Sequence, residues 1–190
     1  MNEYDVAYFQ QINAEEAPQA ERLADLLIWH YKPGSVIDVG CASGLYLKPF
    51  LSRGVKVTGI DYADSAVTDE VLQIPRKYIK IVDITKKPIG RKADLTICLE
   101  VLEHIAEKHA DISVKRIAAS ADIIIFSAAR PGQGGVGHIN CQPKQYWDNL
   151  FVAHGLRRDT QDEEYIKTIM ASGYHMGWLT NNLMIFKKTA

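Results

Sequence analysis

Four short apolar runs in this chain each end in or beside an acidic residue, and this recurrence limits the fold more than any other feature. The runs span residues 35–39, 55–60, 78–82 and 94–99, and their acids are Asp38, Asp61, Asp83 and Glu100. Runs of this length are typical of strands that are buried on both faces of a parallel sheet. Ligands of such sheets bind at the carboxyl ends of the strands. The sequence therefore predicts an acid-lined site at one edge of a parallel sheet.

Helical segments alternate with these runs. Residues 16–31 place leucines at helical spacing and end before Pro33 and Gly34, and further helices are expected after Gly44, from about residue 100 to 120, and over 143–153. Additional strands are expected over 122–126, 156–158 and 183–187. Strands that alternate with helices predict an α/β fold, with a doubly wound sheet and helices on both faces.

Composition limits the class of protein. The chain has 190 residues, 47% of them hydrophobic, and a formal net charge of -1, which suits one globular domain without the basic excess of proteins that bind long nucleic acids. The overall charge is compatible with a local basic patch. The three cysteines are far apart, so the sequence favours neither a zinc knuckle nor a disulfide framework. The polar, acidic start and the short apolar runs lead us to expect a cytoplasmic protein without a signal peptide or membrane span.

The first acid lies in a glycine-rich segment, residues 36–44, which reads VIDVGCASG. Glycines let the backbone turn tightly and let a ligand approach closely. A dinucleotide fingerprint would read GxGxxG, whereas this segment spaces Gly40 and Gly44 by three residues, which speaks against a pyrophosphate site. Each acid taken alone could simply cap a turn or helix.

In combination, these segments resemble the class I S-adenosylmethionine (AdoMet)-dependent methyltransferases over roughly residues 20–130. Residues 38–44 match the family's first motif, with Ala42 at its usual middle glycine. Asp61 matches the acid that holds the ribose hydroxyls, and Asp83 with Ile84 matches the adenine contact. The resemblance implies a Rossmann-like sheet of seven strands, mostly parallel with an antiparallel last strand. It also implies an AdoMet site made by the following residues: Asp38, Gly40, Cys41, Ala42, Gly44, Asp61, Tyr62, Asp83, Ile84, Leu99 and Glu100.

After the fourth run the chain reads EVLEH, from Glu100 to His104. On a helix, the side chains of Glu100, Glu103 and His104 would share one face. The segment resembles the ExxEH segment of the ubiquinone-pathway O-methyltransferases and of the small-RNA 3′-terminal 2′-O-methyltransferases. That resemblance implies a divalent metal beside the acceptor hydroxyl, held by Glu100, Glu103, His104 and His138. The alternative is a metal-free pocket in which Glu100 contacts the cofactor.

A glycine-rich loop over residues 130–140 follows the fifth strand and is expected to lie over the active site. His138 is the candidate general base, because an imidazole titrates near working pH. Glu103 and His104 complete the candidate catalytic set. The stretch GHINCQPKQYW resembles a stretch of small bacterial and phage methyltransferases of the broad type-11 and type-23 grouping.

The acceptor is expected to contact Asn140, Tyr146 and Trp147, although Asn140 could instead cap a helix and the aromatic pair could belong to the core. We expect one domain over residues 1–190. Residues 1–30 would form a helical lid carrying Tyr4, Tyr8 and Phe9. Residues 159–180 would form an acceptor-side insertion, with Tyr174, His175 and Trp178 as candidate contacts.

These residues predict AdoMet-dependent methyl transfer by in-line displacement, preferably to an oxygen of a small molecule. Two alternatives remain: an NAD-dependent oxidoreductase and a catalytically silent AdoMet-binding module. Metal-assisted methylation of a terminal RNA nucleotide is a substrate variant of the main prediction. The sequence predicts neither the acceptor nor the oligomeric state.

Overall fold

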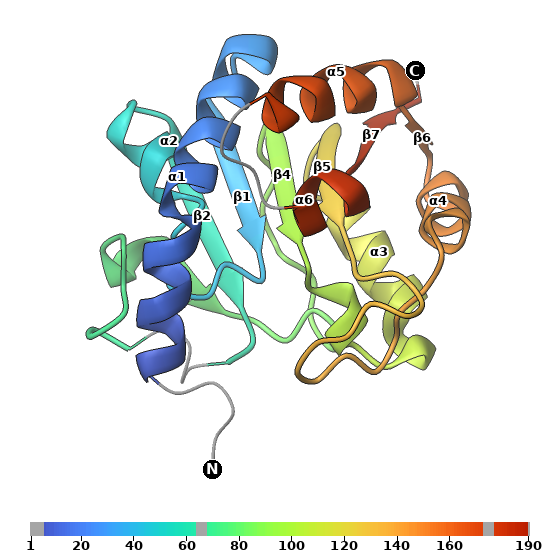
Figure 1. The fold of residues 1–190 in the computed structure, drawn as a ribbon. Coiled ribbons are helices and arrows are strands. Elements are labelled where there is room, and N and C mark those ends of the chain that lie inside the picture. Colours follow the sequence, from blue (N-terminus) through green and yellow to red (C-terminus); the bar gives the residue numbers. More distant parts are fainter. Residues whose placement is uncertain (1–5, 64–67, 173–176, 190) are drawn as a thin grey trace.

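The computed structural model describes residues 6–63, 68–172 and 177–189, and a seven-stranded sheet forms its centre (Figure 1). The strand order is β3-β2-β1-β4-β5-β7-β6. β7 pairs antiparallel with β5 and with β6, and the other neighbours pair in parallel. The expected mixed, Rossmann-like sheet is therefore confirmed. The strands are β1 (Ser35–Val39), β2 (Lys56–Asp61), β3 (Ile79–Ile81), β4 (Leu95–Leu99), β5 (Ile123–Ser127), β6 (Leu156–Arg158) and β7 (Met184–Lys188).

Helices cover both faces of the sheet, as Figure 1 shows. One face carries α1, α2, α5 and α6, and the other carries α3 and α4. Because successive strand residues point to opposite faces, Ile125 packs under the first group while Ile124 and Phe126 pack under the second. The helices are α1 (Val6–Tyr31), α2 (Lys48–Ser52), α3 (Ala110–Ala118), α4 (Lys144–Ala153), α5 (Thr160–Ala171) and α6 (Gly177–Asn182).

Two helices differ in extent from the sequence prediction. α1 begins at Val6 instead of residue 16 and continues through Pro18. Phe9 and Leu23 lie in the same core cluster, so burial against the sheet supports the helix on both sides of the proline. The helix expected after Gly44 is a single short segment, α2, which begins only at Lys48. The glycine-rich turn that precedes α2 is therefore longer than the periodicity predicts.

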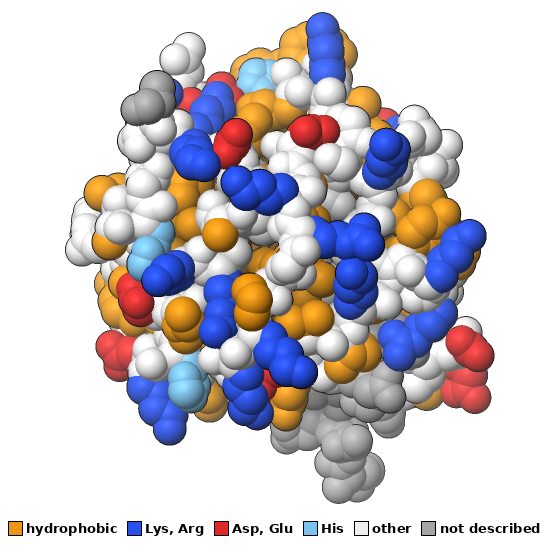
Figure 2. Space-filling model, turned by 180° about the vertical axis from the view of Figure 1, so that it is seen from behind, with side chains coloured by type: hydrophobic (Ala, Val, Ile, Leu, Met, Phe, Trp, Pro, Cys, Tyr) orange, Lys and Arg blue, Asp and Glu red, His pale blue; other side chains and the backbone are white. Residues whose placement is uncertain are grey.

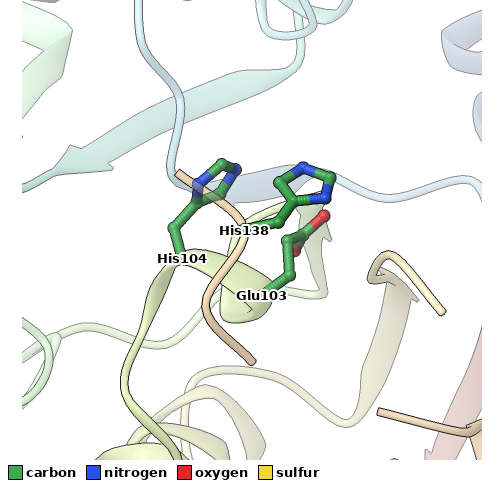
Figure 3. Close-up of side chains that lie close together, drawn as sticks. All are labelled: Glu103, His104 and His138. Carbon is green, nitrogen blue, oxygen red and sulfur yellow. The ribbon is translucent and has the colours of Figure 1, made fainter. Parts of the chain in front are cut away.

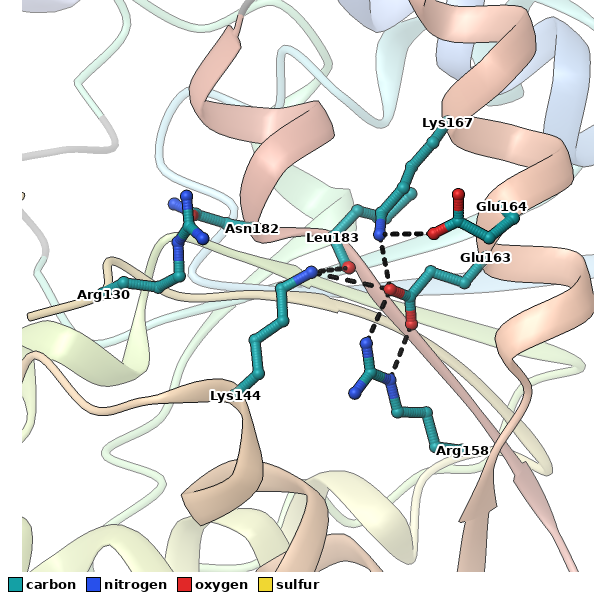
Figure 4. A network of polar contacts seen from close by, with 8 residues as sticks. All are labelled: Arg130, Lys144, Arg158, Glu163, Glu164, Lys167, Asn182 and Leu183. Carbon is teal, nitrogen blue, oxygen red and sulfur yellow. Dashed lines mark hydrogen bonds and ion pairs between the residues drawn. The ribbon is translucent and has the colours of Figure 1, made fainter.

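Helix α5 is attached to the sheet by a buried ion-pair network (Figure 4). Glu163 is 1% exposed and accepts from Arg158 at 2.7 and 2.8 Å and from Lys167 at 2.6 Å. Lys144 lies 3.5 Å from the same carboxylate and donates to the Leu183 carbonyl at 2.8 Å. Burial lowers the pKa of Lys144 to about 8. A buried carboxylate needs such partners, and here they join α4, α5, β6 and the start of β7.

Candidate active site

A cleft of about 1060 Å³ opens at the carboxyl ends of β1, β2 and β4, beside the N-terminal half of α1. The paired register places Val39 beside Ile60, so Asp61 extends just beyond the end of β1. Asp38 and Asp61 both line the cleft, as the sequence predicts. The other predicted cofactor residues that line it are Gly40, Cys41, Ala42, Tyr62, Asp83, Ile84, Leu99 and Glu100.

Asp61 fixes the glycine-rich turn in place. Its Oδ2 accepts from the Ala42 amide and its Oδ1 from the Ala63 amide, both at 2.8 Å. The Gly40 amide donates to the Ile60 carbonyl at 2.8 Å. Ala42 has a φ of 44°, a left-handed conformation that glycine adopts more easily. Asp61 thus orders the turn through the carboxylate that the family resemblance assigns to the ribose hydroxyls.

Gly44 does not line the cleft, in contrast to the sequence prediction. It has a φ of 79°, and a Cβ built there would lie 2.6 Å from Cγ1 of Ile74. The position requires glycine because of backbone conformation and packing. Its contribution to the site is therefore the shape of the turn.

Four carboxyl groups in the cleft have raised pKa values. Burial raises the pKa of Asp38 well above its usual range, with a further contribution from the charge of Asp61, and burial also raises the pKa of Asp61. Burial also raises the pKa of Glu100, and it raises the pKa of Glu16 to about 7. Asp83 differs, because hydrogen bonding from Thr85 lowers its pKa to about 2. Ionised carboxylates are poorly solvated here, and a cationic ligand would stabilise them.

Glu16→Gln is expected to remove a pH-dependent loss of stability. Because the pKa of Glu16 is about 7 in the folded chain and 4.5 in an unperturbed glutamate, the folded state binds more protons between these pH values. Stability therefore falls as the pH rises from about 4.5 to 7, by roughly 3 kcal/mol at most. Glutamine can still accept the bond that Tyr46 donates to Glu16 at 3.0 Å.

Urea unfolding at pH 5 and pH 8 measures this effect. We expect the free energy of unfolding of Glu16→Gln to match that of the wild type at pH 5 and to exceed it at pH 8. Glu15→Gln, an exposed neighbour on the same helix, serves as the matched control. Equal changes for the two variants at pH 8 would contradict the assignment of the effect to burial.

At the other end of the cleft, Glu103, His104 and His138 point toward one another (Figure 3). Their potential ligand atoms lie within 4.8 Å of one another. Glu103 and His104 belong to the 3-10 helix η3 (Leu102–His104), and His138 belongs to the glycine-rich loop. His104 and His138 both line the cleft, while Glu103 is fully buried behind them. The structure thus brings the three predicted catalytic side chains together.

The polar environment of this cluster is uneven. Glu103 Oε1 accepts from the Ala129 amide at 3.0 Å, Oε2 is buried, and the Glu100 carboxyl is a hydrogen-bonding neighbour of this side chain. Burial and the charge of Glu100 raise the pKa of Glu103 to about 8. Burial lowers the pKa of His104, and the charge of His138 adds to this. The His104 and His138 rings stand edge to face, with centroids 4.9 Å apart.

The predicted helical face that would carry Glu100, Glu103 and His104 is wrong. Glu100 has a φ of 53°, which an α-helix does not permit, and its amide donates to the Ser127 carbonyl at 3.0 Å. The next element is η3, and α3 begins only at Ala110. Glu100 therefore follows β4 directly into the cleft, where its carboxyl neighbours that of Glu103, although it lies outside the metal-compatible group of Glu103, His104 and His138.

Asn182 ties Glu100 to the glycine-rich loop. The side chain is 1% exposed, and its Nδ2 lies 3.1 and 3.2 Å from the two Glu100 carboxylate oxygens and 3.0 Å from Gln133 Oε1. Its Oδ1 accepts from Arg130 at 3.1 Å. One amide from α6 thus joins the acid after β4 to two residues of the loop.

The predicted acceptor contacts lie away from the cleft. Trp147 is 1% exposed and packs on Phe126 in the core, with ring centroids 5.5 Å apart, and Tyr146 packs edge-on against Trp147. Asn140 is also buried, and its backbone N–H donates to the backbone carbonyl of Glu103 at 2.9 Å. These positions fit structural roles: the aromatic pair supports α4, and Asn140 supports the backbone of η3.

The N-terminal and C-terminal segments are only partly at the cleft. Tyr8, Phe9 and Trp178 line it, while α5 packs against α1 and β7. Tyr4, Tyr174 and His175 lie outside the described residues. The lid and the acceptor-side insertion stay predictions.

Sequence reasoning missed Asn13, Glu16, Tyr46 and Asn182. Asn13 accepts from Ser43 at 2.6 Å and donates to the Val71 carbonyl at 2.9 Å, so α1 is bonded to the glycine-rich turn. A polar residue on the buried face of a helix, such as Asn13, is a signal that could have indicated this contact.

The chain is similar in sequence to known methyltransferases. Residues 37–121 match a family model described as a methyltransferase domain. Two ubiquinone biosynthesis O-methyltransferases, from Nitrosomonas europaea and Nitrosospira multiformis, are 29% and 30% identical over 80% and 74% of the chain. Together these matches support a class I AdoMet-dependent methyltransferase. It spans 59% and 53% of the lengths of these two relatives.

Solved structures support the methyltransferase fold. An amino pentose methyltransferase from Micromonospora echinaspora, solved with bound AdoMet, gives a TM-score of 0.71 at 16% identity, with 98% of each chain covered. The magnesium protoporphyrin IX methyltransferase of Synechocystis gives a TM-score of 0.67 at 18% identity, covering 95% of this chain and 86% of that one. At these identities the similarity establishes the fold of the methyltransferase and leaves its acceptor open.

Proposed function

We propose that this chain transfers the methyl group of AdoMet to an oxygen atom of a small-molecule acceptor. The observation that carries the proposal is the cleft itself, where buried acids at one end meet a glutamate and two histidines at the other. The similarity to two ubiquinone biosynthesis O-methyltransferases supports an oxygen acceptor.

The charge of the cleft favours AdoMet over NAD. AdoMet carries an ammonium and a sulfonium and no phosphate, so it relieves the unfavourable burial of Asp38, Glu16 and Glu100. A pyrophosphate would be repelled by the same acids. Asp61 is the candidate partner of the ribose hydroxyls, since a carboxylate accepts hydrogen bonds from both.

At the acceptor end, His138 is the candidate general base. The acceptor hydroxyl gives its proton to the imidazole, the oxygen attacks the methyl carbon, and the carbon–sulfur bond breaks as the carbon–oxygen bond forms. The products are the methyl ether, S-adenosylhomocysteine and a protonated His138. A Cβ at residue 135 would overlap the His138 ring as it lies here, so a larger residue would require the ring to turn. Glycine therefore lets the base pack against its own loop.

A divalent cation at the same cluster is a second candidate feature. Glu103, His104 and His138 supply an oxygen and two nitrogens that lie within 4.8 Å of one another, and this mixed donor set suits a divalent cation. A bound cation would lower the pKa of an acceptor hydroxyl. Glu103 would then be the buried charge that holds the ion, and the two imidazoles would orient it from opposite segments of the chain.

Calorimetry with AdoMet and with NAD tests the cofactor. We expect AdoMet to bind and NAD not to bind, and Asp61→Ala to weaken AdoMet binding by roughly tenfold to a hundredfold. Asp122→Ala, which removes an exposed surface carboxylate, should leave the affinity unchanged. Binding of NAD with no binding of AdoMet would overturn the proposal.

Transfer of labelled methyl to a panel of hydroxyl acceptors tests the reaction. The panel includes catechols, sugars and an RNA 3′ end. We expect turnover with a small-molecule hydroxyl. AdoMet binding without turnover on any of them would favour the silent binding module.

A further inference from the structure

Cationic residues are concentrated in one short part of this chain. Residues 76–92 contain seven lysines and arginines and one acid, Asp83, although the whole chain has a net charge of -1. The seven are Arg76, Lys77, Lys80, Lys86, Lys87, Arg91 and Lys92. In the structure this part includes η2 (Arg76–Tyr78), the edge strand β3 and the turn that leads to β4.

A second cavity, of about 630 Å³, lies beside this segment, and we call it the basic groove. It is lined by the first residues of β1 and β2, by the end of α2, by Lys77, Tyr78 and Lys80, and by residues 91–93. It shares no lining residue with the AdoMet cleft, which opens at the opposite ends of β1 and β2. Its cationic side chains are Lys56, Lys77, Lys80, Arg91 and Lys92, and no acidic residue lines it. Seen from behind, the molecule shows many lysines and arginines with few acids between them (Figure 2).

The five cations of the basic groove make no ion pair within the described part of the chain. Arg158 and Lys167, by contrast, are paired with the buried Glu163 (Figure 4). Five exposed positive charges around one hollow repel each other and raise the local potential. This charge is complementary to an anion with several negative groups.

The floor of the basic groove is apolar. The half-buried Leu51 and Tyr78 supply its accessible apolar surface, because Val36, Ile37 and Val57 line it but are at most 7% exposed. The Lys77 ammonium lies 5.1 Å from the centre of the Tyr78 ring. The volume lies in the range of small-ligand sites. An apolar floor with a cationic rim suits a ligand that has a flat apolar part and a highly charged part.

We propose that the basic groove binds a nucleoside polyphosphate, with the phosphates at the lysines and arginine and the base on the apolar floor. The ligand is opposite in charge to AdoMet and occupies a separate site. The proposal therefore stands independently of the proposed methyl transfer.

Calorimetric titration with GTP at low salt tests this site. A guanine nucleotide is chosen, and S-adenosylhomocysteine is present at saturation, so that the adenosine site does not take up the probe. We expect saturable binding that weakens at least tenfold in the double variant Lys80→Glu with Lys92→Glu. Lys115→Glu, an exposed lysine on α3 outside the groove, is the matched control and should bind GTP like the wild type.

Two further probes separate the parts of the proposal. Inorganic triphosphate alone should bind more weakly than GTP, since it lacks the nucleoside. No saturable GTP binding, equal GTP affinity in the double variant, or equal affinity for triphosphate and GTP would each overturn the proposal. Tighter binding of a ten-nucleotide single-stranded RNA than of GTP would assign the surface to nucleic acid instead. Unchanged circular dichroism of the double variant shows that it is folded, and failure of AdoMet to bind would leave the GTP result intact.

Discussion

Gly40→Ala is expected to abolish AdoMet binding and to lower the free energy of unfolding by about 2–5 kcal/mol. Gly40 has a φ of 79°, a left-handed conformation in which a Cβ is strained. A Cβ at this position would also overlap the Val101 side chain, which packs directly over the turn. Relief of the overlap would displace either the glycine-rich turn or the segment after β4, and both line the cleft.

Gly54→Ala is the matched control for this prediction. Gly54 also has a φ of 79°, but a Cβ there would meet nothing within 4 Å. Backbone strain alone should therefore lower the free energy of unfolding of this variant, by about 1–2 kcal/mol, and its AdoMet affinity should be unchanged. Urea unfolding and calorimetry on both variants separate strain from overlap. Equal losses of stability at the two positions would show that the contact with Val101 is unimportant.

His138→Ala is expected to lower kcat by about 10²- to 10⁴-fold, with little change in the dissociation constant of AdoMet. The ring lies at the end of the cleft away from Asp61, so its loss removes the candidate base without removing cofactor contacts. Initial rates of labelled methyl transfer give kcat once an acceptor is found, and calorimetry gives the dissociation constant. His154→Ala is the control, because His154 pairs with Asp111 near the surface, at 2.8 Å.

A chelator separates the two roles that His138 can have in this cluster. If His138 acts as a base alone, treatment of the wild type with EDTA leaves kcat unchanged. If the cluster holds a cation, EDTA and Glu103→Gln each reduce kcat about as much as His138→Ala does, and added cation restores the wild type. Wild-type turnover by His138→Ala would remove this residue from the mechanism.

The strands and the cofactor end could be predicted from the sequence because both depend on local patterns. Each predicted apolar run matches an observed strand to within two residues at either end. Parallel pairing then brings the terminal acids to one edge without any further information. Asp38 and Asp61 needed only strand order and polarity to be placed together.

The acceptor end could not be predicted in the same way. The positive φ of Glu100 is fixed by its bonds to Ser127, which is far away in the sequence, so helical spacing gave the wrong geometry. The sequence suggests that Trp147 contacts the acceptor, but its ring is buried against Phe126 of β5 on the sheet face that α4 covers. Asn182 is 82 residues from Glu100, and no local pattern indicates that the two side chains meet.

The place of β7 in the sheet also sets the order in which this protein can mature. β7 inserts between β5 and β6, and both of these emerge earlier during translation. Until β7 is made, the edge of β5 has no partner, and Asn182, two residues before β7, cannot reach Glu100. A nascent chain that lacks β7 therefore has an unpaired, aggregation-prone edge at β5, and its glycine-rich loop lacks the bond to Asn182. The sheet and the cleft are thus completed in the same step.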